Sequence, residues 1–328
     1  MCLGSRSVWS VLLSVAIFVL MLPGADAQES GSNLLDGKRV LWLGDSITQF
    51  GDYVTFVQYF LNKQYPADKF DFVSIGLASE TASCLSENDH PFPRPCVQER
   101  LKRALALVKP DIVIACYGMN DGIYHPQSQE RMAAFEAGIH KLIAAVKVAH
   151  ASVILLTPPP FDSVPLKNLA DAHAPDFSYK APYADYDKVL ADYARWEMQL
   201  PKADVSLVID LHGPIGAYLG KQRETKPGFT FAAKDGIHPD AAGHLLMARL
   251  VLAGLGASVS HENLDMELAQ IQADPLYALV KSQRESRSAG WFKYVGYTRE
   301  VRVKADSVAD VERENARMQL EVDGMRKH

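Results

Sequence analysis

Five short apolar runs recur along the first two thirds of the chain, and each stops close to a glycine, a proline or an acidic residue. The runs cover residues 40–43, 70–75, 112–116, 152–157 and 205–210. Short continuous apolar runs are typical of strands that are buried on both faces of a parallel sheet. We therefore predict five strands of a single sheet.

Between these runs, apolar residues recur at the spacing of a helix. The helical stretches cover residues 52–63, 97–109, 128–149, 183–200 and 240–255. Strands that alternate with helices of about a dozen residues indicate an α/β fold, in which helices cover both faces of a parallel sheet. Residues 161–182 show no clear period, and they either shape a binding cleft or form a surface excursion.

Beyond Gly256 the chain becomes charged and helical in pattern, over residues 262–288 and 303–327. The last stretch carries a narrow apolar seam with one asparagine in it: Val308, Val311, Asn315, Met318, Val322 and Met325. We favour packing of this seam on the preceding helix of the same chain, and a homodimer through the C-terminal helix is the alternative.

The link between these two stretches is rich in aromatic residues. They are Trp291, Phe292, Tyr294 and Tyr297. We expect them to anchor the helical extension, residues 257–328, to the preceding domain. An aromatic platform for carbohydrate is the alternative.

The N-terminus has the pattern of a signal peptide over residues 1–27. Arg6 supplies a basic region, residues 8–22 are mostly apolar, and Ala25-Asp26-Ala27 offers a cleavage site before Gln28. The alternative is an uncleaved anchor, although the apolar run is short for a membrane span. We expect export to the periplasm or the extracellular space, with membrane contact only through this segment.

Composition narrows the class of protein. The chain has 328 residues, an apolar fraction of 48% and a formal net charge of −5. These values are typical of a folded protein of enzyme size, with one large domain or one domain plus an extension. The mild negative charge, without a basic patch interleaved with aromatics, gives no indication of nucleic-acid binding.

Export favours pairing of cysteines. Cys84 and Cys96 bracket a loop rich in proline and polar residues, and a disulfide between them would close a loop of roughly a dozen residues, which contributes ~3 kcal/mol in the chain-entropy model. Cys116 ends an apolar run and is expected to be a buried free thiol. The alternative is that all three thiols are unpaired.

Several polar residues with chemical potential follow the predicted strands or precede the last helix. Ser46, Gly76 and Asn120 come after the first three strands, and Asp235 and His238 precede the helix at 240–255. Because the carboxyl ends of parallel strands meet at one edge of a sheet, these residues are expected to lie together. The simpler alternative for Ser46 is that Asp45 and Ser46 only cap the next helix.

Each of these residues has a task that acyl transfer requires. Ser46 can attack an ester carbonyl if His238 takes its proton, and Asp235, three residues before His238, can hold the imidazole in the right tautomer. Asp121 is an alternative acid, but the distance of Asp235 from His238 is fixed locally. We therefore predict a catalytic triad of Ser46, His238 and Asp235.

The tetrahedral intermediate of such a reaction needs hydrogen-bond donors for its oxyanion. The backbone N–H groups of Ser46 and Gly76 and the side-chain amide of Asn120 would supply three. Gly76 lacks a Cβ atom, which allows its N–H to approach closely. We predict that these three residues form the oxyanion hole.

Four stretches of the chain resemble, in order, the four sequence blocks of the SGNH (GDSL-like) hydrolases. They are Gly-Asp-Ser-Ile-Thr at 44–48, Gly76, Gly-Met-Asn-Asp at 118–121 and Asp-Gly-Ile-His-Pro at 235–239. The second block is partial, since the family's asparagine is replaced around Ser74 and its second glycine by Ser79. The resemblance covers roughly residues 38–256, and it does not extend to the helical extension.

The resemblance implies a three-layer α/β/α fold of the flavodoxin-like kind with a five-stranded parallel sheet, and a Ser-His-Asp esterase without metal or organic cofactor. Within the family, the chain looks most like exported bacterial carbohydrate acetylesterases. The expected function is hydrolysis of short acyl esters, with acetyl esters of carbohydrate as the first choice of substrate. A lipase or thioesterase-like acylhydrolase is one alternative, and a catalytically retired binding protein on the same fold is another.

Overall fold

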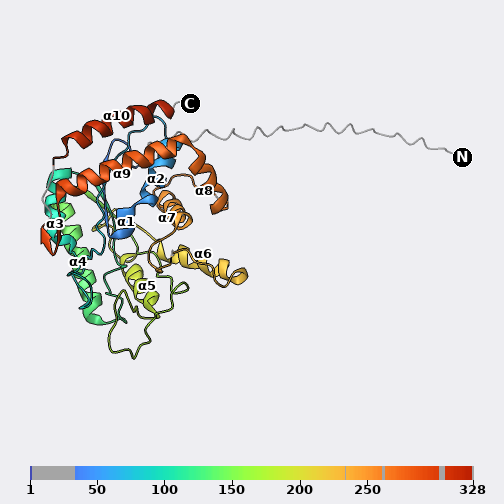
Figure 1. The fold of residues 1–328 in the computed structure, drawn as a ribbon. Coiled ribbons are helices and arrows are strands. Elements are labelled where there is room, and N and C mark those ends of the chain that lie inside the picture. The colour runs from blue at the N-terminus through green and yellow to red at the C-terminus, as the bar shows by residue number, and fades with distance from the viewer. Residues whose placement is uncertain (2–33, 233, 261–262, 303–306, 327–328) are drawn as a thin grey trace. The chain divides into compact units, whose positions relative to one another are not determined.

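A computed structural model describes residues 1, 34–232, 234–260, 263–302 and 307–326. The predicted signal peptide therefore lies outside the described residues, apart from Met1. From residue 34 onward, the described residues form one compact unit (Figure 1). Among them, no helix combines the length and the apolar character that a membrane span requires.

The central feature is a sheet of five strands that all run parallel, in the order β2-β1-β3-β4-β5. The strands are β1 (Arg39–Gly44), β2 (Asp71–Ser74), β3 (Ile112–Cys116), β4 (Ser152–Leu156) and β5 (Leu207–Ile209). Each lies within or overlaps one of the five apolar runs. The predicted three-layer α/β/α fold with a five-stranded parallel sheet is confirmed.

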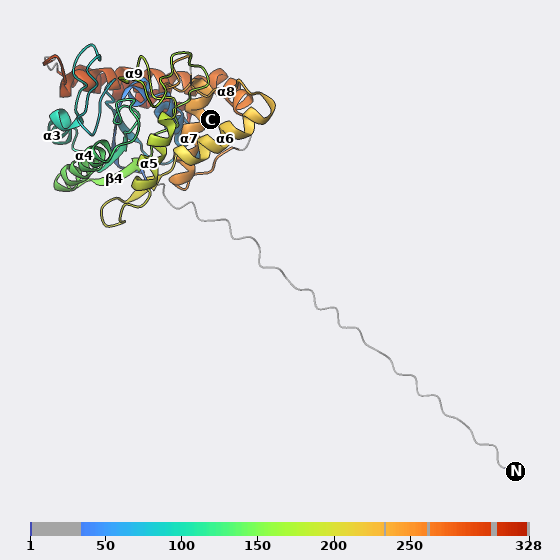
Figure 2. The same ribbon diagram turned by 90° about the horizontal axis from the view of Figure 1, so that it is seen from below.

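The strand order reverses direction at β1, and this reversal distributes the helices. The chain first moves outward from β1 to β2 and then returns past β1 to β3, β4 and β5. Right-handed crossovers therefore place α2 (Asp52–Gln64) on one face and α3 (Val97–Val108), α4 (Gln129–Val148) and α5 (Tyr186–Glu197) on the other. The closing helix α7 (Ala241–Gly254) packs on α2, and α3 packs beside α4 (Figures 1 and 2).

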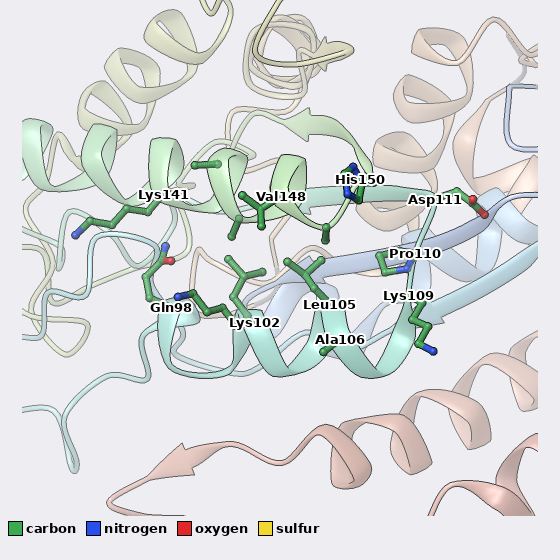
Figure 3. Close-up of a pocket in the computed structure, with 14 residues that line it drawn as sticks. Gln98, Lys102, Leu105, Ala106, Lys109, Pro110, Asp111, Lys141, Val148 and His150 are labelled. Atoms are coloured by element: carbon green, nitrogen blue, oxygen red, sulfur yellow. The ribbon is translucent and has the colours of Figure 1, made fainter.

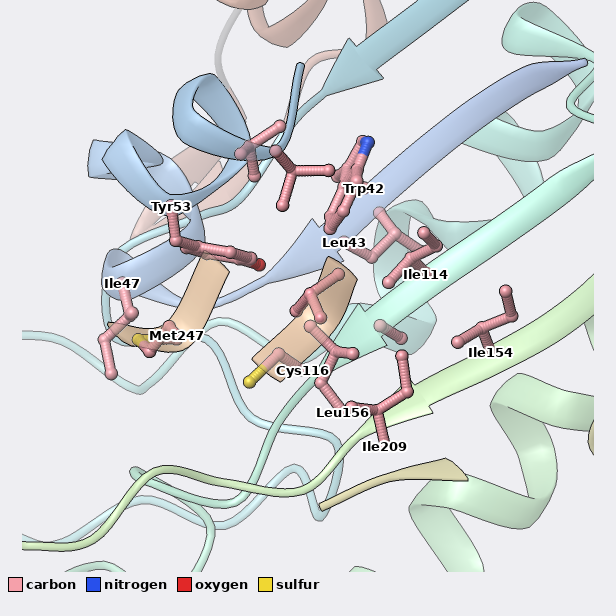
Figure 4. Packing of buried hydrophobic residues seen from close by; sticks show 14 of the residues in the cluster. Trp42, Leu43, Ile47, Tyr53, Ile114, Cys116, Ile154, Leu156, Ile209 and Met247 are labelled. Atoms are coloured by element: carbon pink, nitrogen blue, oxygen red, sulfur yellow. The ribbon is translucent and has the colours of Figure 1, made fainter. Parts of the chain in front are cut away.

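The buried face beneath α2 and α7 shows how the strand register builds the core. Trp42, Ile114 and Ile154 are aligned across β1, β3 and β4, and all three side chains are buried. The Trp42 ring lies 5.8 Å from the ring of Tyr53 on α2. Figure 4 shows these residues together with Met247 of α7. The hydrophobic surface of the sheet and of both helices is thus removed from water in one cluster.

Several elements differ from the sequence prediction. The short helix α1 (Ser46–Phe50), the helix α6 (His212–Thr225) and a small hairpin of β6 (Thr298–Arg299) and β7 (Val301–Arg302) were not predicted. The predicted helical stretch at 262–288 is interrupted at Asp274, which caps a new helix that begins with Pro275. It is therefore two helices, α8 (Leu264–Ala273) and α9 (Pro275–Val295).

The prediction that the four aromatic residues lie in a link between two helical stretches is also corrected. Trp291, Phe292 and Tyr294 lie in the last turns of α9, and only Tyr297 follows that helix. Trp291 is buried, and the Phe292 ring lies 4.5 Å from the ring of Tyr297. The described part of 303–327 forms α10 (Ala309–Met325).

The C-terminal helices pack against each other and on the rest of the chain. α10 lies along α9 (Figure 1), and Met318 and Val322 of its apolar seam are buried. Gly290 of α9 makes this approach possible, because a Cβ atom there would lie 2.3 Å from a methyl group of Val311. The predicted packing of this seam on the preceding helix of the same chain is thus confirmed.

Arg287 of α9 connects the extension to the outer edge of the sheet. Its Nη1 donates to the carbonyl oxygen of Phe72 on β2 at 2.9 Å and lies 2.6 Å from a carboxylate oxygen of Asp71. Its Nε donates to Glu312 of α10 at 2.9 Å. The Arg287 side chain is only 7% exposed. One buried guanidinium thus joins β2, α9 and α10.

We predict that Arg287→Ala lowers the free energy of unfolding by about 3 kcal/mol, because it leaves the buried Phe72 carbonyl without its donor and removes the guanidinium from the carboxylates of Asp71 and Glu312. Arg313→Ala is the matched control, since Arg313 pairs with Asp310 on the exposed surface of α10 and should leave the stability almost unchanged. Urea unfolding monitored by circular dichroism measures both. Equal stability of the two variants would contradict the structural role of Arg287.

Candidate active site

Ser46 lies at the junction between β1 and α1, at the carboxyl edge of the sheet. Asp45 fixes this junction, because its carboxylate accepts a hydrogen bond from the Ile47 N–H at 2.9 Å and so caps α1. Ser46 is buried with 8% of its surface exposed. The capping expected of Asp45 is therefore present, and it places Ser46 at the first position of the helix.

The structure brings His238 and Asp235 to Ser46, although about 190 residues separate them in the sequence. His238 Nε2 lies 2.7 Å from Ser46 Oγ, and His238 Nδ1 lies 2.6 Å from Asp235 Oδ2. With the ring proton on Nδ1, that N–H donates to Asp235, and Nε2 can accept the hydroxyl proton of Ser46. This arrangement can activate a serine for attack on a carbonyl carbon.

The loop that carries His238 is held by its own backbone and by a residue far away in the sequence. Asp235 Oδ1 accepts hydrogen bonds from the N–H groups of Ile237 and His238, each at 3.0 Å. Gly236 adopts a φ of +69°, and a Cβ atom there would lie 2.3 Å from the carbonyl oxygen of Asp162. Only glycine fits this position without strain.

Asp162 is a positioning residue that the sequence analysis missed. Its N–H donates to the Gly236 carbonyl at 2.8 Å, and its buried carboxylate accepts from Arg223 and Thr230, each at 2.6 Å. It is the second residue of the segment at 161–182, so the start of that segment supports the His238 loop. A single aspartate after a proline run gives no local signal of such a contact.

The charges of the pair favour an ionised aspartate beside the imidazole. Desolvation opposes ionisation of Asp235, but hydrogen bonds from the His238 ring and from the backbone of His238 and Ile237 outweigh it and lower its pKa to about 2. Desolvation also disfavours protonated His238, yet the hydrogen bond and the charge of Asp235 outweigh it and raise the His238 pKa. Asp235 therefore stabilises the imidazolium form of His238.

Asn120 lies beside Asp45, the residue before the nucleophile, and the orientation of its amide is defined by a hydrogen bond. The Tyr124 hydroxyl donates to Asn120 Oδ1 at 3.0 Å, which leaves Nδ2 as the donor side. Nδ2 makes only long contacts, 3.4 Å to Asp45 Oδ2 and 3.3 Å to the Glu80 carbonyl. Burial raises the pKa of Asp45 to about 7, although the Ile47 N–H opposes this effect. The amide N–H group can thus turn toward a stronger acceptor.

Gly76 comes two residues after the end of β2 and packs closely on α1. A Cβ atom at Gly76 would lie 2.3 Å from the Gln49 nitrogen and 2.7 Å from the Asp45 carbonyl oxygen. Any larger residue would push β2 away from the turn that carries Ser46. Ser79, which stands where the family has its second glycine, adopts a φ of +70°, a conformation that glycine favours.

Asp121 has a different task from Asp235. Its carboxylate accepts hydrogen bonds from three backbone N–H groups, those of Ala82, Ser83 and Gly118, at 2.8, 2.7 and 2.8 Å. Burial raises its pKa to about 6, against the effect of these bonds. Asp121 therefore ties the loops after β2 and β3 together, and Asp235 is the carboxylate beside His238.

A buried ionic cluster beneath Asn120 was also missed from the sequence. Glu80 accepts two hydrogen bonds from Arg100, at 2.6 and 2.7 Å, and one from the Tyr117 hydroxyl at 2.7 Å. Nearby, a disulfide joins Cys84 and Cys96. Of the described cysteines, Cys116 is free and buried. The disulfide and the ionic cluster fix the loop that packs behind Asn120.

A wide hollow of about 1160 Å³ lies between α3 and α4, and none of the predicted site residues lines it. Figure 3 shows Leu105 and Val148 within it and lysines such as Lys102 and Lys141 around it. Within the described residues, no group of three or more His, Cys, Asp or Glu side chains is placed to hold a metal ion.

Comparison with known proteins gives a consistent picture. The sequence model of the GDSL-like Lipase/Acylhydrolase family matches residues 42–246. No curated protein matches the sequence. Among solved structures, a gut microbial diltiazem-metabolizing enzyme has a TM-score of 0.50 and 20% identity, over 67% of this chain and 47% of that chain. This chain thus spans about half the length of that enzyme.

A catalytic mutant of Axe2, an acetylxylan esterase from Geobacillus stearothermophilus, has a TM-score of 0.51 and 21% identity, over 70% of this chain and 100% of that chain. A second Axe2 mutant, described as an acetyl-xylooligosaccharide esterase, has a TM-score of 0.51 and 22% identity, over 70% and 98%. At these identities, the likeness shows that the fold is shared.

We predict that an NMR titration will give His238 a pKa above its ordinary value of 6.5, because ionised Asp235 favours the imidazolium form. In Asp235→Asn, this pKa should fall, since the charge and the ionic hydrogen bond are lost. His90, in the disulfide loop, is the internal control and should titrate alike in both proteins. An unchanged His238 pKa in Asp235→Asn would show that the two side chains are not coupled.

Proposed function

Because the chain belongs to the family of GDSL-like lipases and acylhydrolases, we propose that it is a serine esterase that uses Ser46, His238 and Asp235. The family makes it an ester-hydrolysing enzyme. The observation that carries the assignment of residues is the hydrogen-bonded chain from Ser46 Oγ through the His238 ring to Asp235. A retired binding site would have no need of all three groups at these distances.

In the proposed mechanism, the Ser46 oxygen attacks the ester carbonyl while His238 Nε2 takes its proton. The oxyanion that forms accepts hydrogen bonds from the N–H groups of Ser46 and Gly76 and from Asn120 Nδ2. Asp235 holds the Nδ1–H and stabilises the imidazolium ion. The imidazolium then gives its proton to the leaving alcohol, and an acyl-enzyme remains on Ser46.

Water releases the acyl group by the same steps in reverse order. His238 removes a proton from the water molecule as its oxygen attacks the acyl carbon. The bond between that carbon and Ser46 Oγ then breaks, and the imidazolium returns a proton to Ser46 Oγ. The products are a carboxylic acid and the free enzyme. Every proton in this cycle moves through one imidazole nitrogen, and no residue beyond those named takes part in a proton transfer.

We propose short acyl groups, and acetyl esters of carbohydrate in particular, as the substrates. The resemblance of the sequence blocks to carbohydrate acetylesterases supports this choice, and the fold shared with an acetylxylan esterase agrees with it. Export, proposed from residues 1–27, would bring the enzyme to such substrates. The Cys84–Cys96 disulfide fits an oxidising compartment.

We predict that the protein hydrolyses nitrophenyl acetate and that Ser46→Ala loses nearly all of kcat, on the order of 10⁴-fold or more, because the nucleophile is gone. Ser286→Ala, an exposed serine on α9, is the matched control and should keep the full rate. A series of nitrophenyl esters from acetyl to octanoyl measures the preference for acyl length.

The outcomes separate the alternatives. Rates that rise steadily with acyl length would favour a lipase-like acylhydrolase over an acetylesterase. If no ester is turned over and a serine-directed phosphonate fails to label Ser46, the protein is a binding protein on this fold, and the esterase proposal is wrong.

We predict that Asn120→Ala lowers kcat by ~10²–10³-fold with little change in KM, because the amide donates mainly to the oxyanion of the transition state. Tyr124→Phe removes only the bond that orients the amide, so its kcat should fall less. Thermal unfolding of both variants checks that the site is intact. A KM effect without a kcat effect would place Asn120 in substrate binding and outside the oxyanion hole.

A further inference from the structure

A hollow of about 330 Å³ lies against the end of α1, the short helix that begins with the nucleophile, and one of its walls comes from the C-terminal extension. Gln49 and Phe50 of α1 and Gly76 after β2 line one side. Residues of α9 line the other side, among them Ser288, Phe292 and Lys293. The volume falls within the range of small-molecule sites.

The wall supplied by α9 lies outside the part of the chain that matches the family, which ends at residue 246. It is attached to α1 and α2 directly: Arg284 Nη2 donates to the Phe50 carbonyl of α1 at 2.9 Å, and Arg284 Nε donates to Thr55 Oγ1 of α2 at 3.0 Å. Arg284 is buried. The hollow is therefore held between two rigid elements, in a place that the family's sequence blocks do not determine.

The hollow lies on the side of the site where we expect the alcohol half of the ester. The Phe50 ring, which is 56% exposed, lies 5.1 Å from the His238 ring. Gly76, on the same side, is a proposed oxyanion donor. In the cycle above, His238 gives its proton to the leaving alcohol, so the alcohol must lie next to the imidazole. A leaving group that extends past Phe50 reaches the hollow.

The lining fits a ring that carries hydroxyl groups. Phe50 and Phe292 offer flat apolar faces, which pack on the C–H faces of a sugar ring. The Ser288 hydroxyl and the exposed Lys293 ammonium offer polar groups to such a ring. Gln49 offers its Nε2 as a donor, since its Oε1 accepts from the Ala78 N–H at 2.6 Å. The guanidinium of Arg284 already donates to Phe50 and Thr55 and lies 3.5 Å from Glu285, so it is not a free binder of an anionic group.

We propose that this hollow is a subsite for the alcohol part of the substrate, and that it takes a neutral polyhydroxylated ring such as a pyranose unit. The proposal rests on the proposed esterase function and adds that α9 determines which alcohols the enzyme accepts. Ser288 and Phe292 are then specificity-determining residues that lie outside the hydrolase sequence blocks.

The test compares two esters that share the acetyl group and differ in the alcohol, acetylated xylotriose and methyl acetate. In the full chain, Ser288→Phe fills the hollow and should lower kcat/KM for acetylated xylotriose on the order of tenfold more than kcat/KM for methyl acetate. Ser286→Phe is the matched control, because it places the same ring on the exposed side of α9, away from the hollow. Its ratio of the two kcat/KM values should equal that of the wild type.

A second measurement does not depend on the folding of Ser288→Phe. Unacetylated xylotriose should inhibit methyl acetate hydrolysis by the wild type competitively, and Lys293→Ala, an exposed change at the hollow, should weaken that inhibition on the order of threefold. Wild-type activity on methyl acetate with no inhibition by xylotriose, or an unchanged ratio in a folded Ser288→Phe, overturns the subsite alone. Inactivity of the wild type on both esters overturns the esterase function and the subsite with it.

Discussion

The reversal at β1 of the order in which strands are added to the parallel sheet is the constraint on which the rest of the structure depends. Because β1 lies between β2 and β3, the chain leaves the ends of β1 and β3 toward opposite faces of the sheet, and a crevice opens between them. Ser46 follows one of these strands and Asn120 follows the other. The nucleophile and the amide donor are thus brought together by topology, before any side chain contacts another.

The remaining geometry depends on carboxylates that serve backbone N–H groups. Asp45 caps α1, Asp121 ties two loops, and Asp235 holds both its own turn and the imidazole. Asp162 supports the His238 loop in another way, through its backbone N–H, which donates to the Gly236 carbonyl. Each of these contacts gives a hydrogen-bond partner to a backbone group that would otherwise be buried without one. The result is a preorganised site, in which the reacting groups need little rearrangement when charge develops.

The sequence could predict those parts of this arrangement that depend on residues close together in the chain. Buried strands produce apolar runs, and Asp235 and His238 share one turn, so both were visible before the fold was known. Helix α6 was missed because its glycines at 213, 216 and 220 weaken the helical pattern that tertiary contacts restore. The support that Asp162 gives to Gly236 and the pairing of Glu80 with Arg100 join distant segments. Their residues look like ordinary surface charges in the sequence.

The contact of Arg287 with Phe72 has a consequence for the behaviour of the protein in a crowded solution. β2 is an edge strand, and its outward N–H and C=O groups would offer a template on which a strand of another molecule could pair. Helix α9 runs beside this edge. The Arg287 guanidinium donates a hydrogen bond to the Phe72 carbonyl, which is then not available to another strand. A chain that loses the residues after α7 to a protease could keep its nucleophile and still be lost to aggregation, because the uncovered edge would be free to recruit copies of itself.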